Sequence, residues 1–406
     1  MKLASPEVLP IDGFRFAGLA AGIKANGRPD LALAVADAAC SAAGLFTTNL
    51  VRAAPVTVAE ARVLGGRARA VLANSGCANA CTGAPGLEAT LASTRAVARA
   101  LGAPDAEVLP ASTGVIGALL ASSKIEAHAA ALVSALSRDG AAAFAEAILT
   151  TDRGPKVASL RGEIAGRPFH VLGIAKGAGM IHPAMAPAAP HATMLAFLFT
   201  DAAAPPRALA RALALAADAT FHTATVDGDT STNDTLLALA SGRAADASRG
   251  EDEPATALVD AFTSVSDLLA RAIVSDGEGA EHLAEVVVRG LASDADARVV
   301  ARTVATSSLV KTALFGRDPN WGRLLAAAGR AGVAFDPARA RIAIEGIGIV
   351  EQGVAVGPDA EARARAILER PSYTVELTLG DGPGRARYLT CDLGLGYVRC
   401  NADYRS

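Results

Sequence analysis

The sequence has few cysteines, and their spacing matches no familiar framework. Five cysteines occur in 406 residues, and no two of them form a CxxC pair. An odd number without such a pair indicates neither a disulfide framework nor a zinc site. We therefore expect no resident metal ion. The five are Cys40, Cys77, Cys81, Cys391 and Cys400.

The sequence also lacks a basic block and the familiar nucleotide-binding motifs. Its net charge is −3 and its pI is near 6.1, which makes nucleic acid or an anionic membrane an improbable partner. No Walker A loop, HExxH pair or dinucleotide fingerprint is present, so no bound cofactor is expected. The N-terminus has no apolar signal region, which predicts a mature cytosolic protein.

One stretch is free of charged residues, but it is not a membrane helix. Residues 177–200 contain no Lys, Arg, Asp or Glu, yet Pro183, Pro187 and Pro190 interrupt them. A composition that is 51% hydrophobic and 19% charged suits a globular protein with a large core. Short apolar strands alternate with alanine-rich helices along the whole chain, which predicts a mixed α/β fold.

The same stretch carries the strongest chemical signal. Lys176 stands in a glycine-rich turn, and the short apolar run 194–199 reads as a buried strand. Thr193 comes just before that strand. If the Ala192–Thr193 bond were cut, Thr193 would gain a free α-amine with a pKa near ~8, beside its own hydroxyl. Such an amine can act as the base that a threonine nucleophile requires. The alternative is an ordinary β-branched residue at the start of a strand.

Other polar stretches follow apolar strands. The strand 68–73 leads into a loop of small polar residues, 74–83, which either lines a site or forms an ordinary turn. A second strand ends in Ser112-Thr113-Gly114, where a hydroxyl and an unhindered N–H could together stabilise an oxyanion. The alternative there is a plain turn. The acidic loop 226–234 matches no calcium-binding spacing.

Lysine is scarce, whereas arginine is plentiful. Most of the six lysines lie in turns marked by glycine or proline, where a compact point charge suits better than a planar guanidinium. They are Lys2, Lys24, Lys124, Lys156, Lys176 and Lys311.

Several of these stretches together resemble one family, the ornithine acetyltransferases of the arginine pathway (bifunctional glutamate N-acetyltransferase). The resemblance runs along nearly the whole chain. The most specific motifs are Lys-Gly-Ala-Gly-Met-Ile at 176–181, Ala-Thr-Met-Leu at 192–195 and Asp-Pro-Asn-Trp-Gly-Arg at 318–323. The remaining matches are 44–56, 74–83, 112–117, 150–156, 227–234, 276–280, 309–317 and 397–406.

The resemblance implies a self-cleaving enzyme with a threonine nucleophile. The chain would be cut between Ala192 and Thr193 into an α chain, 1–192, and a β chain, 193–406. Thr193 would be the nucleophile, with Thr113 and Gly114 as the oxyanion pair. The residues that match the family's substrate-binding positions are Thr150, Thr151, Lys176, Thr193, Glu278, Asn401 and Ser406.

The resemblance also implies a fold, an assembly and a reaction. The fold would be an α/β sandwich of stacked sheets with outer helices, similar to N-terminal-nucleophile hydrolases but connected differently. The cut chains would assemble as α2β2 or larger. The enzyme would move an acetyl group from N2-acetylornithine to glutamate by ping-pong catalysis without a cofactor. Acetyl-CoA is a second acetyl donor that the sequence leaves open.

Two departures from the family pattern stand near the site. The loop 187–192 is about six residues longer than the usual Pro-x-Met-Ala-Thr run, and His191 within it either assists cleavage or is a plain loop residue. Cys77 replaces a common asparagine, as a structural exchange or as a reactive thiol. Two other functions remain open: a related self-processing aminopeptidase or amidase, and a non-catalytic scaffold in which the longer loop prevents cleavage.

Overall fold

The computed structural model describes residues 8–182, 185–186 and 194–402. The described chain divides into two compact units. The larger one comprises residues 8–222 and 229–273, and the smaller one comprises 223–228 and 274–402. Each unit is described by itself.

The larger unit is built on one nine-stranded sheet, in the order β4-β3-β2-β9-β8-β6-β5, with β1 and β7 also paired to β2. Strands β8 and β9 are parallel, as are β3 and β4, and the other pairs are antiparallel. The strands are β1 Phe14–Leu19, β2 Leu31–Thr47, β3 Arg67–Cys77, β4 Val108–Val115, β5 Lys156–Ile164, β6 Arg167–Lys176, β7 Met185–Ala186, β8 Leu195–Thr200 and β9 Thr235–Ala240.

Strand β2 turns this single sheet into two layers. Its first part pairs with β1 and β3, its last part pairs with β9, and the pairing register with β3 shifts between Val35 and Cys40. Side chains from both parts of the sheet meet in one buried cluster, for example Ala34 of β2 with Phe197 of β8. Aromatic rings join the layers edge to face, with 5.0 Å between the ring centroids of Phe16 and Phe199.

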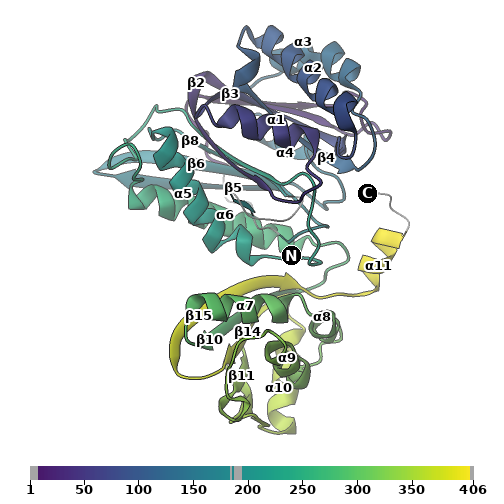
Figure 1. Cartoon of the computed structure of the whole chain (residues 1–406), viewed down its shortest axis with the longest axis vertical. Coiled ribbons are helices and arrows are strands. Elements are labelled where there is room, and N and C mark those ends of the chain that lie inside the picture. Colours follow the sequence, from purple (N-terminus) through teal and green to yellow (C-terminus); the bar gives the residue numbers. More distant parts are fainter. Residues whose placement is uncertain (1–7, 183–184, 187–193, 403–406) are drawn as a thin grey trace. The chain divides into compact units, whose positions relative to one another are not determined.

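Helices cover the outer faces of the two layers (Figure 1). Helices α2 (Gly83–Leu101) and α3 (Ser122–Ser134) pack on the face that alternate residues of β2, such as Leu33, present. Helices α5 (Pro206–Ala219) and α6 (Thr256–Ser275) cover the other layer. A Cβ added at Gly173 of β6 would lie only 2.5 Å from Val265 of α6. The predicted class, a stacked-sheet α/β sandwich with outer helices, is confirmed.

Two shorter helices of the larger unit contribute to the cluster between the layers. They are α1 (Ala54–Val63), which contributes Val56, and α4 (Ala141–Ala147), which contributes Phe144. Proline at the first positions of α1 and α5 fits there because the first N–H groups of a helix need no partner within it.

The smaller unit is a second α/β body with its own core. Its six-stranded sheet has the order β13-β12-β11-β14-β10-β15, in which β10 and β14 are parallel. Valines of β10 and β14 pack against apolar residues of α7, α9 and α10. The elements are α7 Asp294–Ala305, α8 Ser308–Phe315, α9 Trp321–Gly329, α10 Pro358–Leu368, α11 Leu395–Ala402, β10 Leu283–Gly290, β11 Arg341–Ile344, β12 Ile347–Glu351, β13 Val354–Ala355, β14 Ser372–Thr378 and β15 Gly382–Cys391.

Some local predictions were wrong. Strands β3 and β4 continue through the polar residues that were predicted as a loop or a turn. They do so because the two strands pair there, with Asn74 opposite Ser112 and Ser75 opposite Thr113.

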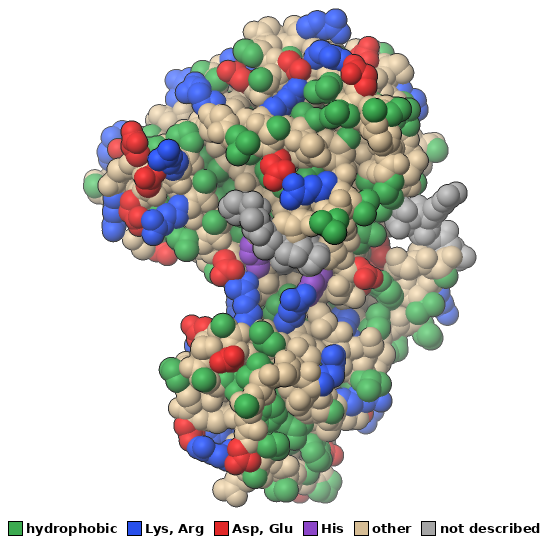
Figure 2. Space-filling view, in the orientation of Figure 1, with side chains coloured by type: hydrophobic (Ala, Val, Ile, Leu, Met, Phe, Trp, Pro, Cys, Tyr) green, Lys and Arg blue, Asp and Glu red, His purple; other side chains and the backbone are tan. Residues whose placement is uncertain are grey.

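On the face of the larger unit in Figure 2, acidic and basic side chains are interspersed. Among the described residues, no helix combines the length and the apolar character that crossing a membrane requires.

Candidate active site

The predicted oxyanion pair lies on β4, which pairs in parallel with β3. Thr113 is buried on β4 opposite Ser75 of β3, and Gly114 lies opposite Gly76. Gly114 has a φ of 130°, and a Cβ added there would lie 2.6 Å from the backbone nitrogen of Cys77. A side chain at position 114 would therefore clash with the neighbouring strand, which explains the glycine.

Lys176 brings three of the predicted residues together. It is the last residue of β6, and it is only 3% exposed. Its Nζ donates to Thr150 Oγ1 at 2.8 Å and to Thr113 Oγ1 at 3.4 Å. Thr151, the next residue along the chain, is half-buried. The buried cluster thus joins β4, β6 and the segment that follows α4.

Asp152 balances the charge of this cluster, although the sequence reasoning did not single it out. Its Oδ2 lies 3.6 Å from Lys176 Nζ, and its Oδ1 accepts a hydrogen bond from Lys156 Nζ at 2.7 Å. The same carboxylate accepts from the N–H groups of Gly177 and Thr150, at 2.6 and 3.0 Å. Burial opposes ionisation, but Lys176 and Lys156 hold the pKa of Asp152 well below its ordinary value. The i,i+4 spacing of Asp152 and Lys156 was the available sequence signal.

Asp234 directly precedes β9, and its carboxylate contacts Met194, the residue before β8. The N–H of Met194 donates to Asp234 Oδ1, while Oδ2 has no hydrogen-bond partner in the described structure. Asp234 is fully buried, and this burial raises its pKa well above the ordinary value, although the N–H of Met194 and the charge of Lys176 act the other way. The sequence indicated only an acidic loop here.

The loop before Asp234 is hydrogen-bonded to β4 and to the residue that follows β3. Asn233 Nδ2 donates to the carbonyl oxygens of Ala78 and Ser112, at 2.6 and 2.9 Å. Asn233 itself accepts from Thr232 Oγ1 at 2.6 Å. No group of His, Cys, Asp and Glu among the described residues could hold a metal ion.

Three predicted residues lie outside the described part of the chain. They are Ala192 and Thr193, which would flank the scissile bond, and Ser406. His191 also lies outside it. The described chain resumes at Met194.

Two further predicted residues meet in the smaller unit. Glu278 Oε2 accepts from Asn401 Nδ2 of α11 at 2.9 Å. Gly279, with a φ of 70°, lies so close to the backbone nitrogen of Tyr397 that no side chain would fit. The structure therefore brings Glu278 and Asn401 together, and separately joins Thr113, Thr150 and Lys176 in the larger unit.

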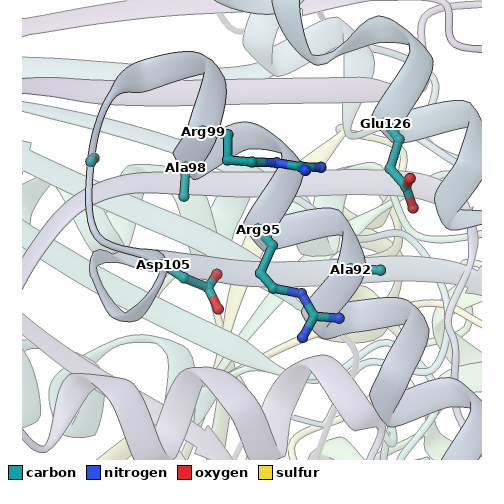
Figure 3. A pocket seen from close by; sticks show the side chains of 7 residues that line it. Ala92, Arg95, Ala98, Arg99, Asp105 and Glu126 are labelled. Atoms are coloured by element: carbon teal, nitrogen blue, oxygen red, sulfur yellow. The ribbon is translucent and has the colours of Figure 1, made fainter.

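A hollow elsewhere in the larger unit contains none of the predicted residues. It has a volume of about 330 Å³ and lies among α2, α3 and the short 3-10 helix Asp105–Glu107. Figure 3 shows Arg95 and Arg99 on its wall together with Asp105 and Glu126, so its charges are mixed.

The larger unit thus combines a layered sheet with a buried cluster of threonine and lysine side chains. The sequence model of the ArgJ family matches residues 15–406, and the chain belongs to this family. The predicted family is thereby confirmed, and with it the predicted class of enzyme.

Curated relatives match along the full length. The arginine biosynthesis bifunctional protein ArgJ of Geobacter sulfurreducens is 46% identical over 401 residues, which cover 98% of this chain and 100% of that protein. The ArgJ protein of Gloeobacter violaceus is 47% identical over 398 residues, covering 97% and 96%. Among solved structures, the ornithine acetyltransferase complexed with ornithine from Mycobacterium tuberculosis is 41% identical. That match covers 44% of this chain and 95% of the other, with a TM-score of 0.40.

Proposed function

We propose that the chain cuts itself between Ala192 and Thr193 and then transfers the acetyl group of N2-acetylornithine to glutamate. The observation that carries the proposal is the contact of Lys176 with Thr113 and Thr150, in a chain of the ArgJ family. The relatives are named as enzymes of arginine biosynthesis. Two covalent half-reactions follow from the chemistry of these groups.

In the first half-reaction, Thr193 Oγ1 attacks the acetyl carbon of N2-acetylornithine, and the α-amine of Thr193 takes the hydroxyl proton. Thr113 and Gly114 stabilise the negative charge that develops on the acetyl oxygen. The C–N bond then breaks, the proton passes to the leaving nitrogen, and ornithine departs. In the second half-reaction, the α-amine of glutamate attacks the acetyl ester and releases Thr193.

Charge complementarity assigns the binding residues. N2-acetylornithine carries an α-carboxylate and a δ-ammonium. The cation of Lys176 suits the carboxylate, and the carboxylate of Glu278 suits the ammonium. Asn401 both donates and accepts hydrogen bonds, and Thr150, Thr151 and Ser406 supply hydroxyls.

The cut chains would remain together and assemble as α2β2. Neither self-cleavage nor the acetyl transfer needs a cofactor. The word bifunctional in the relatives' names makes acetyl-CoA the second donor to examine. Release of CoA on mixing the enzyme with acetyl-CoA and glutamate would identify the bifunctional form.

The test begins with the intact mass of the freshly purified protein. We expect two chains, the second beginning at Thr193, whereas Thr193→Ala should leave one chain of 40.8 kDa. Thr193→Ser is the matched control, because serine keeps the hydroxyl and should still be cut. A wild-type chain that stays whole on incubation would contradict the mechanism.

Product analysis then separates the candidate reactions. The cut enzyme is incubated with N2-acetylornithine, with and without glutamate. N-acetylglutamate should form only when glutamate is present. Free acetate formed at the same rate without glutamate would indicate a hydrolase.

A further inference from the structure

Lys24 lies beside β3, the neighbour of β4, and none of the roles proposed above involves it. It belongs to the loop between β1 and β2, and a Cβ added at Gly76 would lie 2.9 Å from Lys24 Cγ. Gly76 is paired with Gly114. The stem of Lys24 therefore packs on the glycine next to the oxyanion pair, within the same unit as Thr113 and Lys176.

The backbone of Lys24 is fixed, whereas its charge has no carboxylate partner. Asp30 accepts from the N–H groups of Ala21 and Lys24, at 2.6 and 2.8 Å, and so fixes the loop. The Lys24 amine donates to the neutral carbonyl of Pro29 at 2.8 Å. No carboxylate of the described residues lies within ion-pair distance of it.

Lys24 is partly buried among charged groups of both signs, and Arg28 among them is paired with Glu146 at 2.9 Å. Burial, followed by the nearby Arg28, lowers the pKa of Lys24 to about 8, and Lys176 acts in the same direction. Asp30 and Glu146 oppose this shift. Lys176 differs, because Asp152 partly balances its charge. Lys24 therefore carries a positive charge at neutral pH and would gain from a bound anion.

The two substrates of the proposed reaction differ at one end. Both carry an α-carboxylate, but N2-acetylornithine has an ammonium where glutamate has a second carboxylate. In a ping-pong reaction the two amino acids occupy the same site in turn. The second carboxylate of glutamate needs a cation other than Lys176, and a lysine on a flexible stem without a carboxylate partner can provide it.

We propose that Lys24 binds the side-chain carboxylate of the acetyl acceptor and so makes the enzyme selective for a dicarboxylic amino acid. This inference rests on the proposed function. It adds a specificity residue for the second half-reaction. This residue lies beside β3, the strand that pairs with the proposed oxyanion pair of β4.

The test compares acceptors in Lys24→Met, which keeps the length of the side chain but removes the charge. The KM for glutamate should rise about 10-fold or more, as expected for losing a hydrogen-bonded charge pair. Glutamine has no side-chain carboxylate, so its weaker use as an acceptor should not change. The rate at which N2-acetylornithine alone acetylates the cut enzyme, measured by mass spectrometry, should also be unchanged. Lys24→Arg should recover most of the affinity for glutamate.

Lys124→Met is the matched control. Lys124 is an exposed lysine of α3 that donates to the carbonyl of Gly22 in the same loop, and its loss should leave both acceptors unaffected. An equal rise in KM for glutamate and glutamine in Lys24→Met would overturn the proposal, as would slower acetylation by N2-acetylornithine. Failure of the proposed function looks different, since wild-type enzyme would then transfer no acetyl group to any acceptor.

Discussion

Two buried carboxylates of the larger unit, Asp152 and Asp234, have pKa values that are shifted in opposite directions. Both side chains are almost completely enclosed, so burial alone would raise the pKa of each. Asp152 has two lysines and two N–H groups around it, whereas Asp234 has a hydrogen bond from Met194 and no ion pair in the described structure. The comparison shows that the partners of a buried carboxylate, rather than its depth of burial, decide the direction in which its pKa shifts.

The largest effect is expected from Asp152→Ala. This substitution removes the carboxylate that both buried lysines, Lys156 and Lys176, contact, which should lower the free energy of unfolding by about 3–5 kcal/mol. Denaturant titration measures the change. Asp252→Ala breaks the exposed pair with Arg207 and serves as the control, with an expected change below about 1 kcal/mol. Equal effects of the two substitutions would show that Asp152 is not an essential counter-ion.

A smaller effect is expected from Lys176→Met. Asp152 keeps its 2.7 Å hydrogen bond with Lys156, so no charge is left alone, and the loss should be about 1–2 kcal/mol. Acetyl transfer should nevertheless fall steeply, because Lys176 is the proposed partner of the substrate carboxylate. Transfer rates and unfolding curves of one preparation test both statements. If the variant is less stable but its folded molecules transfer acetyl groups at the wild-type rate, Lys176 is not part of the site.

The last effect depends on pH and is expected from Asp234→Asn. Because burial raises the pKa of Asp234, the folded protein holds a proton that the unfolded chain releases above about 3.9. Wild-type stability should therefore fall, relative to Asp234→Asn, as the pH rises above about 4. The depressed pKa of Asp152 acts in the opposite direction, and its contribution is lost only as the pH falls below the ordinary range. Parallel stability curves would mean that Asp234 is ionised in the folded protein.

Much of the fold could be predicted from local sequence. Short apolar runs predicted β8 and the first part of β3. The polar ends of β3 and β4 could not be predicted in this way, because their conformation depends on pairing between residues 38 positions apart, such as Asn74 and Ser112.

The site followed the same rule. Lys176 and Thr113 could be named from motifs, and the scarcity of lysine was informative, since Lys156, Lys176 and Lys311 are all buried. Asp152 and Asp234 were missed because the sequence does not show which of its 41 acidic residues become enclosed. The partner of Asp234, Met194, is 40 residues away along the chain.

The order of the strands has a consequence for the cut protein. Strands β8 and β9, which follow Thr193, lie between β2 and β6, which precede it. After cleavage, the β chain would supply the two middle strands of a sheet whose outer strands belong to the α chain. The two fragments could not separate without breaking the backbone hydrogen bonds between β2 and β9 and between β6 and β8. Once denatured, they would have to find each other again in a bimolecular step, so the uncut precursor should refold far more readily than the mature enzyme.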